Sequence, residues 1–349
     1  RQICRIAAEE QVDGILLAGD IFDKSIASQE ALELYDEAMT EICNGLRIPV
    51  YLIAGNHDGA QRIAQCSALL EKSGLYIAGA LTGKPQKVRN GDVDIYLLPW
   101  ISTDKVRSVF PEQAEKVLSM EDAYRIVLDR YRADFTPGQK NILVAHAFIV
   151  NAQTSESDRA AEVGRATMVS ASVFEGFDYV ALGHIHKPQW VKSGKIRYSG
   201  SLMKYSFSES LQNKSVTLLD WKAKDDLTVT TIPLQPEQDM RVIQGKLEDL
   251  LEHAEPSEDW IRAELTDKEL IPYALERLRM SYPNLMELVY LYQEEQIAAS
   301  NTEVKLVPEQ SLVELLGGFL DSVYQYQLEE EPEAYQLMEE ICKDAEQEK

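Results

Sequence analysis

The chain has 349 residues, of which 45% are hydrophobic, and this is enough for two or three domains with at least one full-sized core. No apolar run approaches the roughly 18 residues needed to span a bilayer, and the N-terminus lacks a basic stretch followed by an apolar one, which argues against membrane insertion and export. The four cysteines show no CxxC spacing. This pattern suggests neither a zinc ribbon nor a disulfide framework, and it favours a reducing cytoplasm.

The formal net charge of −23 is distributed unevenly along the chain. Residues 1–235 hold 26 Lys and Arg against 30 Asp and Glu, a net charge of −4, whereas residues 236–349 hold 9 against 28, a net charge of −19. The acidity therefore belongs to the C-terminal third. The balanced N-terminal part, where metal binding would neutralise some carboxylates, stays compatible with a DNA substrate.

Helical segments alternate with short apolar strands from residue 1 to about residue 235. Helices are expected at residues 2–10, 29–44 and 121–132. The strand-like segments are "GILLAGD" at 14–20, "VYLIAGNHD" at 50–58, "VDIYLLPW" at 93–100, "NILVAHAFIV" at 141–150 and "YVALGHIH" at 179–186. This alternation predicts an α/β fold with a largely buried sheet. "IRYSGSL" at 196–202 and "SVTLLDW" at 215–221 resemble strands of a second sheet, which would give a layered sandwich.

A stretch containing Pro and Gln at residues 232–240 separates this region from a second unit. There "DWIRAEL", "IPYALERLRMSY" and "LMELVYL" predict strand, helix and strand, a small α+β module. After Pro308, apolar residues recur at steps of three and four and predict one stripe on an acidic helix: Leu312, Leu316, Phe319, Val323 and Tyr326. The predicted domains are residues 1–235, 236–305 and 306–349.

Four strand-like segments end on residues that can bind a metal. "AGD" ends on Asp20, "AGNHD" on Asn56, His57 and Asp58, "VAH" on His146, and "GHIH" on His184 and His186. Ligands gather at the carboxyl ends of strands in α/β sheets, so these groups are expected to meet. Four of the five histidines of the chain belong to this set.

The donor types predict the chemistry. Carboxylate, amide and imidazole ligands without thiolates suit manganese or iron better than zinc. A carboxylate that bridges two such ions, about 3.5–4 Å apart, allows activation of water and in-line attack on phosphorus, so phosphoester hydrolysis is predicted. Taken singly, Asp20 could be a helix cap, Asn56 a turn amide, and the "HIH" pair a polar strand end. Only the joint pattern favours a metal site.

The order "GD", "GNHD", a single downstream His and "GHIH" resembles the calcineurin-like metallophosphoesterases. Within that superfamily, "LAGDIFDK", "IAGNHDG", "FEGFDYVALGHIHKPQ" and "RYSGSLMKYSFSE" are similar to the bacterial exonuclease subunits that are counterparts of the archaeal and eukaryotic double-strand-break nuclease. The likeness is strong to about residue 235 and looser beyond it. It implies a four-layer β-sandwich flanked by helices, and a two-metal, manganese-dependent DNA nuclease with 3′-to-5′ double-strand exonuclease and single-strand or hairpin endonuclease activity in DNA repair.

The resemblance also implies roles for single residues. Asp20 would bridge two Mn²⁺ ions, with Mg²⁺ or Fe²⁺ as alternatives. The first ion would also be bound by Asn56, His146 and His184. The second ion would have one further ligand, His186. His57 would not bind metal but would protonate the leaving oxygen or stabilise charge on the phosphate. Asp58 would orient His57, with a structural turn role as the alternative, and Asp23 is left without a role.

Further expectations concern the start of the chain and its partners. The chain begins at Arg1, and the resemblance implies an absent first strand ending in an Asp-x-His pair, so this chain is expected to bind one ion well, a second weakly, and to have little activity. The resemblance implies a DNA-capping role for residues 236–305. It also implies docking of residues 306–349 on an SMC-type ATPase, within a heterotetramer that contains a homodimer of this chain.

Two other functions stay open at this stage. A phosphodiesterase or phosphatase for a small molecule or a phosphoprotein could carry an identical metal centre, although the C-terminal third would be unnecessary for a small substrate. A non-catalytic subunit that holds DNA ends is the second alternative, and the presence of His57 argues against it.

Overall fold

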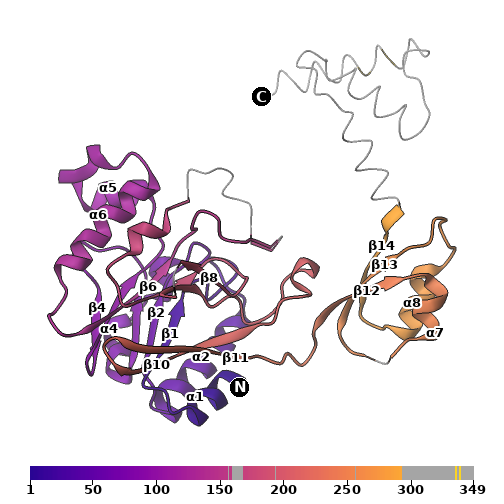
Figure 1. Ribbon diagram of the computed structural model, residues 1–349, viewed down its shortest axis with the longest axis horizontal. Helices are drawn as coiled ribbons and strands as arrows, with labels where there is room; N and C mark the ends of the chain where they lie inside the picture. The colour runs from indigo at the N-terminus through magenta and orange to yellow at the C-terminus, as the bar shows by residue number, and fades with distance from the viewer. Residues whose placement is uncertain are drawn as a thin grey trace. The chain divides into compact units, whose positions relative to one another are not determined.

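Figure 1 presents a computed structural model of the chain. The structure describes residues 1–155, 157–158, 168–192, 194–255, 257–292, 335 and 338. Apart from two single positions, the predicted segment 306–349 lies outside the described residues, and the predicted domain boundaries stay predictions. No helix in the described ranges is long and apolar enough to cross a membrane.

The first sheet contains three parallel strands in the order β1-β2-β3. Their bounds are Ile15–Ala18 for β1, Val50–Ile53 for β2 and Leu75–Ala78 for β3. Apolar residues of this sheet pack with residues of α1 (Gln2–Glu9) and α2 (Gln29–Thr40), among them Ala7 and Met39. Ala18 is paired with Ile53, so β1 and β2 end at the same edge of the sheet. Two short helices, α3 (Ala60–Ile63) and α4 (Ser67–Leu70), lead to β3.

The second sheet contains six strands in the order β4-β5-β6-β7-β9-β8. Strands β5, β6, β7 and β9 are parallel, and the edge strands β4 and β8 are antiparallel to their neighbours. The bounds are Lys87–Asn90 (β4), Val93–Leu98 (β5), Lys140–His146 (β6), Tyr179–Gly183 (β7), Gln189–Lys192 (β8) and Ile196–Tyr198 (β9).

Helices α5 (Thr103–Val109) and α6 (Met120–Ala133) pack against the second sheet. Helix α6 begins with a capping box, because Ser119 Oγ accepts the Asp122 N–H while the Asp122 carboxylate accepts the Ser119 N–H. Its buried residues, which include Tyr124, Val127 and Leu128, recur at steps of three and four.

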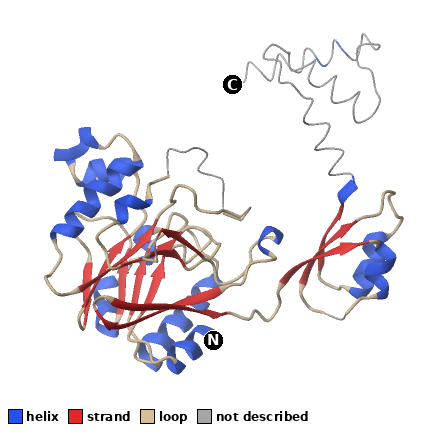
Figure 2. Cartoon of the chain, in the orientation of Figure 1, coloured by secondary structure: helices blue, strands red, loops and turns tan. Residues whose placement is uncertain are grey.

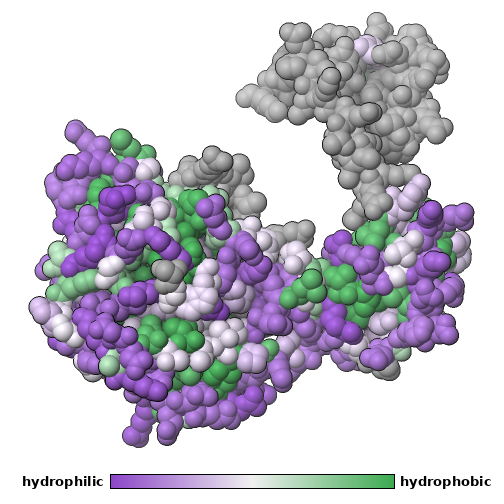
Figure 3. Space-filling model, viewed as in Figure 1, coloured by the Kyte–Doolittle hydropathy of each residue, from purple (hydrophilic) through white to green (hydrophobic). Residues whose placement is uncertain are grey.

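The two sheets pack face to face. Tyr51 and Ile53 of the first sheet share a buried cluster with Ile95, Leu97 and Val144 of the second. Helices cover the outer faces of both sheets, which gives four layers and confirms the predicted sandwich flanked by helices (Figure 2). Figure 3 shows polar and charged residues over most of the viewed face of this sandwich, as expected when the apolar faces of the sheets are buried.

The allocation of strands to sheets differs from the prediction. The five strands expected in one sheet are divided between two, since β1 and β2 pair only with each other and β3. The segment 196–202 belongs to the six-stranded sheet. Its strand ends at Tyr198, because Gly200, at φ +83°, turns the chain beside Pro188. Segment 215–221 lies in β10 (Ser215–Ala223), which forms a separate hairpin with β11 (Asp226–Pro233).

The predicted strand, helix and strand of the C-terminal module are confirmed. They are β13 (Trp260–Leu265), α8 (Ala274–Ser281) and β14 (Leu285–Tyr290). Two elements were not predicted: β12 (Met240–Gly245), which gives the sheet order β12-β13-β14, and α7 (Leu247–Glu252), which packs on α8.

Candidate metal centre

The predicted metal ligands follow strands of both sheets. Asp20 and Asn56 come after β1 and β2 of the first sheet, His146 is the last residue of β6, and His184 follows β7. His146 is paired with Gly183, so β6 and β7 end side by side. The packing of the two sheets brings the four strand ends together.

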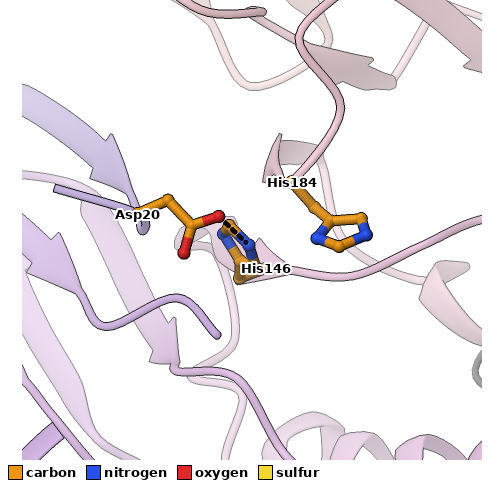
Figure 4. Close-up of side chains that lie close together, drawn as sticks. All are labelled: Asp20, His146 and His184. Carbon is orange, nitrogen blue, oxygen red and sulfur yellow. Dashed lines mark ion pairs between the residues drawn. The ribbon is translucent and has the colours of Figure 1, made fainter. Parts of the chain in front are cut away.

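Short distances join the four side chains. His146 Nε2 lies 3.0 Å from Asp20 Oδ2 and 2.9 Å from Asn56 Oδ1, and His184 Nδ1 lies 3.1 Å from the same Asn56 oxygen. Asp20, His146 and His184 offer ligand atoms that all lie within 4.8 Å of one another (Figure 4). Within the described ranges this is the one group of acidic, histidine or cysteine side chains that meets this criterion.

The hydrogen bonds of the buried His146 fit a cation at this position. Its Nδ1 lies 2.7 Å from the Ala18 carbonyl oxygen, which can only accept, so Nδ1 carries the proton. In the neutral ring the lone pair of Nε2 then faces the oxygens of Asp20 and Asn56. An imidazole nitrogen, a carboxylate oxygen and an amide oxygen that face one another at these distances form a donor set that suits a divalent ion.

The environment sets the charge of two of these groups. Burial alone would raise the pKa of Asp20, but His146 and the backbone N–H of His57 lower it to about 2. Burial, with the charge of His146 as a smaller cause, lowers the pKa of His184 to about 4. At neutral pH the first side chain is an anion and the second a neutral imidazole, and these are the forms that bind metal.

The backbone at the strand ends is unusual. Asp20 and His184 have positive φ angles of 50° and 104°, which residues other than glycine rarely adopt. A Cβ added to Gly55 would overlap the Asp20 side chain, and one added to Gly183 would overlap the Ala18 carbonyl oxygen. These glycines therefore permit the close approach of β1, β2 and β7, on which the distances in the centre depend.

Two aromatic residues of the centre were not predicted. Trp100, after β5, stacks on His184 with ring centroids 5.5 Å apart and an interplanar angle of 21°. Phe148 lies against the same imidazole, with a centroid distance of 5.4 Å. The backbone N–H of Trp100 also donates to the Ala54 carbonyl, 2.9 Å away, which joins the two sheets next to the candidate ligands. One feature of the sequence pointed to Trp100: it ends "VDIYLLPW", the strand-like segment that does not end on a candidate ligand.

His57 lies beside the centre but outside the close group of ligands. Its backbone N–H donates to Asp20 Oδ1, 2.9 Å away, and its ring Nδ1 lies 2.8 Å from the Asp23 carbonyl oxygen. The carboxylate of Asp58 accepts from the backbone N–H groups of Ile21, Phe22 and Gly55. These bonds join the Asp20 and Asn56 loops, so they favour the structural alternative for Asp58 over orientation of the His57 ring.

His186 stands apart from the other predicted ligands. Its Nδ1 lies 2.8 Å from Ser157 Oγ and 3.4 Å from Glu209 Oε1. Glu209 is fully buried, and Lys214 Nζ lies 2.5 Å from its other oxygen. Burial would raise the pKa of Glu209, but hydrogen bonds from His186, Lys214 and Ser157 lower it to about 2. Sequence reasoning missed Glu209 and Lys214, although both lie in or beside the "YSGSLMKYSFSE" segment.

Comparisons with known proteins agree with this geometry. Residues 1–188 match the calcineurin-like phosphoesterase family, and residues 236–324 match the family described as type 5 capsule protein repressor C-terminal domain. The chain is also similar to the SbcD subunit of the nuclease SbcCD from Staphylococcus epidermidis (strain ATCC 12228 / FDA PCI 1200). The two are 31% identical over 309 residues, which cover 88% of this chain and 82% of the relative. The first match spans more than half of the chain and contains every predicted ligand, so the chain belongs to the calcineurin-like phosphoesterases and, among them, to the SbcD family.

Proposed function

We propose that the protein is the nuclease subunit of an SbcCD-type complex and hydrolyses phosphodiester bonds of DNA with the help of divalent metal ions. The main support is the convergence of Asp20, Asn56, His146 and His184 from four strand ends and two sheets. The similarity to a nuclease subunit over 88% of the chain supports DNA as the substrate.

The same four residues would hold one divalent ion. We favour Mn²⁺, with Mg²⁺ or Fe²⁺ as alternatives, because the donors are oxygen and nitrogen atoms without thiolates. A bound divalent ion supplies water of lowered pKa and neutralises charge on a phosphate oxygen. Asp20 would be shared with a second ion, for which His186 is the other ligand, and the hydrogen bond from His57 N–H orients the shared carboxylate.

His57 would transfer a proton rather than bind metal. The Asp23 carbonyl accepts the Nδ1 proton of its ring, so Nε2 is the nitrogen available to a substrate. A histidine held this way can protonate the leaving oxygen or stabilise charge on the phosphate. The bond also fixes the ring beside Asp20 before substrate arrives, which reduces the entropy lost in the transition state.

The substrate class can be tested with the purified chain. We expect slow, Mn²⁺-dependent cleavage of end-labelled linear DNA, no cleavage with EDTA, and none in an Asp20→Asn variant that keeps its fold. Labels at either end distinguish 3′-to-5′ digestion from endonuclease action on hairpins. Cleavage of bis(p-nitrophenyl) phosphate without cleavage of DNA would favour a small-molecule phosphodiesterase. DNA binding without any hydrolysis would favour a non-catalytic end-binding subunit.

The C-terminal residues would supply the contacts with partners. We propose that residues 236–305 cap the DNA and that residues 306–349 dock on an SMC-type ATPase, in a heterotetramer with two copies of this chain. Deleting residues 306–349 should abolish capture of the ATPase in a pull-down and leave metal-dependent cleavage unchanged, because every proposed ligand precedes residue 187. Full capture by the shortened chain would contradict the docking role.

A further inference from the structure

A second polar cluster surrounds His186, apart from the close group of Asp20, His146 and His184. Its charged members are Asp158, the fully buried Glu209, and Lys214, which is 5% exposed and pairs with Glu209. A buried ion pair adds little net stability, because desolvation of both charges offsets their attraction. The position of this pair against a proposed metal ligand therefore needs another explanation.

The hydrogen bonds in this cluster determine which nitrogen of His186 carries the proton. The Ser157 hydroxyl donates its single proton to Glu209 Oε1. It can then only accept from His186 Nδ1, which lies 2.8 Å away. Glu209 Oε1 lies 3.4 Å from the same nitrogen and can only accept, so this contact also favours a proton on Nδ1. Nδ1 is thus the protonated atom, and in the neutral ring Nε2 keeps its lone pair.

The backbone of His186 is held by the same cluster. Its N–H donates to Asp158 Oδ1, 2.7 Å away, and its carbonyl accepts from the Ser201 N–H at 3.0 Å. Lys214 Nζ also lies 3.0 Å from that carbonyl oxygen and 2.8 Å from Ser201 Oγ. The Glu209–Lys214 pair therefore connects the carboxylate that orients the His186 ring to the backbone carbonyl of His186.

We propose that Glu209 is a positioning residue that, through Ser157 and held by Lys214, keeps the Nδ1 of His186 protonated and leaves Nε2 free to bind a divalent metal ion. The inference rests on the proposed function, in which His186 is a metal ligand. Histidine ligands are commonly ordered this way, by a carboxylate or carbonyl that accepts the proton of the other ring nitrogen. Here the carboxylate acts mainly through a serine hydroxyl.

The tautomer of His186 provides a direct test. Long-range ¹H–¹⁵N spectra of the metal-free chain with ¹⁵N-labelled histidine, at about pH 8 so that an ordinary histidine is neutral, distinguish the two forms. The His186 signal is assigned from a His186→Gln variant. We expect the Nδ1–H form in the unmodified chain. In Glu209→Gln the new amide can donate to Ser157, which frees the hydroxyl proton for Nδ1, so the Nε2–H form should rise severalfold.

Two further variants make the result specific. Glu175→Gln is the matched control, because Glu175 also pairs with a lysine, Lys192 at 2.7 Å, but both side chains are exposed; it should leave the His186 signal unchanged. If Glu209→Gln does not fold, Ser157→Ala, which removes the bridging hydroxyl but leaves both charges of the buried Glu209–Lys214 pair in place, should shift the tautomer in the same direction. An Nε2–H form in the unmodified chain, or an unchanged tautomer in folded variants, would overturn the inference. Because no metal or DNA is present, failure here is distinguishable from failure of the proposed nuclease function.

Discussion

His57 differs from the other histidines of the centre, because its link to Asp20 is made by the backbone. A His57→Ala variant keeps that N–H, so we expect unchanged metal binding by calorimetry. Cleavage of DNA should fall by about 10²- to 10⁴-fold, the usual contribution of general acid–base catalysis. His253→Ala is a matched control, since that ring also bonds to a backbone carbonyl, Asp249 O at 3.0 Å, but lies outside the centre. Loss of metal from the His57 variant would contradict the assignment.

His184 has to stay neutral in the folded, metal-free protein. Its pKa is about 4 when folded and near 6.5 when unfolded. Between these values the unfolded chain binds more protons, so the free energy of unfolding should fall as the pH falls from about 6.5 to about 4, by at most about 3 kcal/mol from this residue. Urea unfolding in EDTA at about pH 7 and about pH 5 measures the effect. A His184→Gln variant should show a smaller pH dependence, and equal dependence would show that His184 is not the cause.

At the scale of secondary structure, the ends of β1, β2 and β7 depend on small residues. Gly183→Ala would place a methyl group on the Ala18 carbonyl oxygen and force β1 and β7 apart. We expect a loss of about 1–3 kcal/mol in the free energy of unfolding and weaker metal binding, because Asp20 and His184 move apart. Gly83→Ala is the control, since nothing lies within 4 Å of the added atom. Thermal melts and metal titration of both variants decide the point.

The strand ends could be predicted because their signal is local. An apolar run that stops at "GD", "GNHD", "AH" or "GHIH" indicates both a strand and a candidate ligand. The structure brings Asp20, Asn56, His146 and His184 together as expected. The division of strands between two sheets could not be predicted, because the buried strands of both sheets have the same apolar pattern. Glu209 and Lys214 were missed for another reason. They lie in or after a single turn without periodicity, and only tertiary packing brings them to His186.

The whole molecule should bind two divalent ions with unequal strength. Four side chains converge on one position, whereas the other proposed site has Asp20 and His186, and the latter lies in a separate cluster. Calorimetric titration with Mn²⁺ should therefore give one tight site and one much weaker site. Asp20→Asn should weaken both, since in the proposed centre this carboxylate is shared by the two ions. Two equally tight sites in the unmodified chain would contradict the ligand assignment.

The stacking of Trp100 on His184 gives the protein an optical signal of its own. The Trp100 indole lies 5.5 Å from the imidazole of His184, a proposed ligand, which is close enough for a paramagnetic ion bound there to quench the indole fluorescence. Mn²⁺ should thus reduce the emission of Trp100, while Trp190, Trp221 and Trp260 respond little. In a Trp100→Phe variant, which keeps an aromatic ring against His184, the decrease should disappear although calorimetry still records binding. Occupation of the centre could then be followed in stopped-flow experiments without labels, and the time at which metal enters could be compared with the time at which DNA is cut.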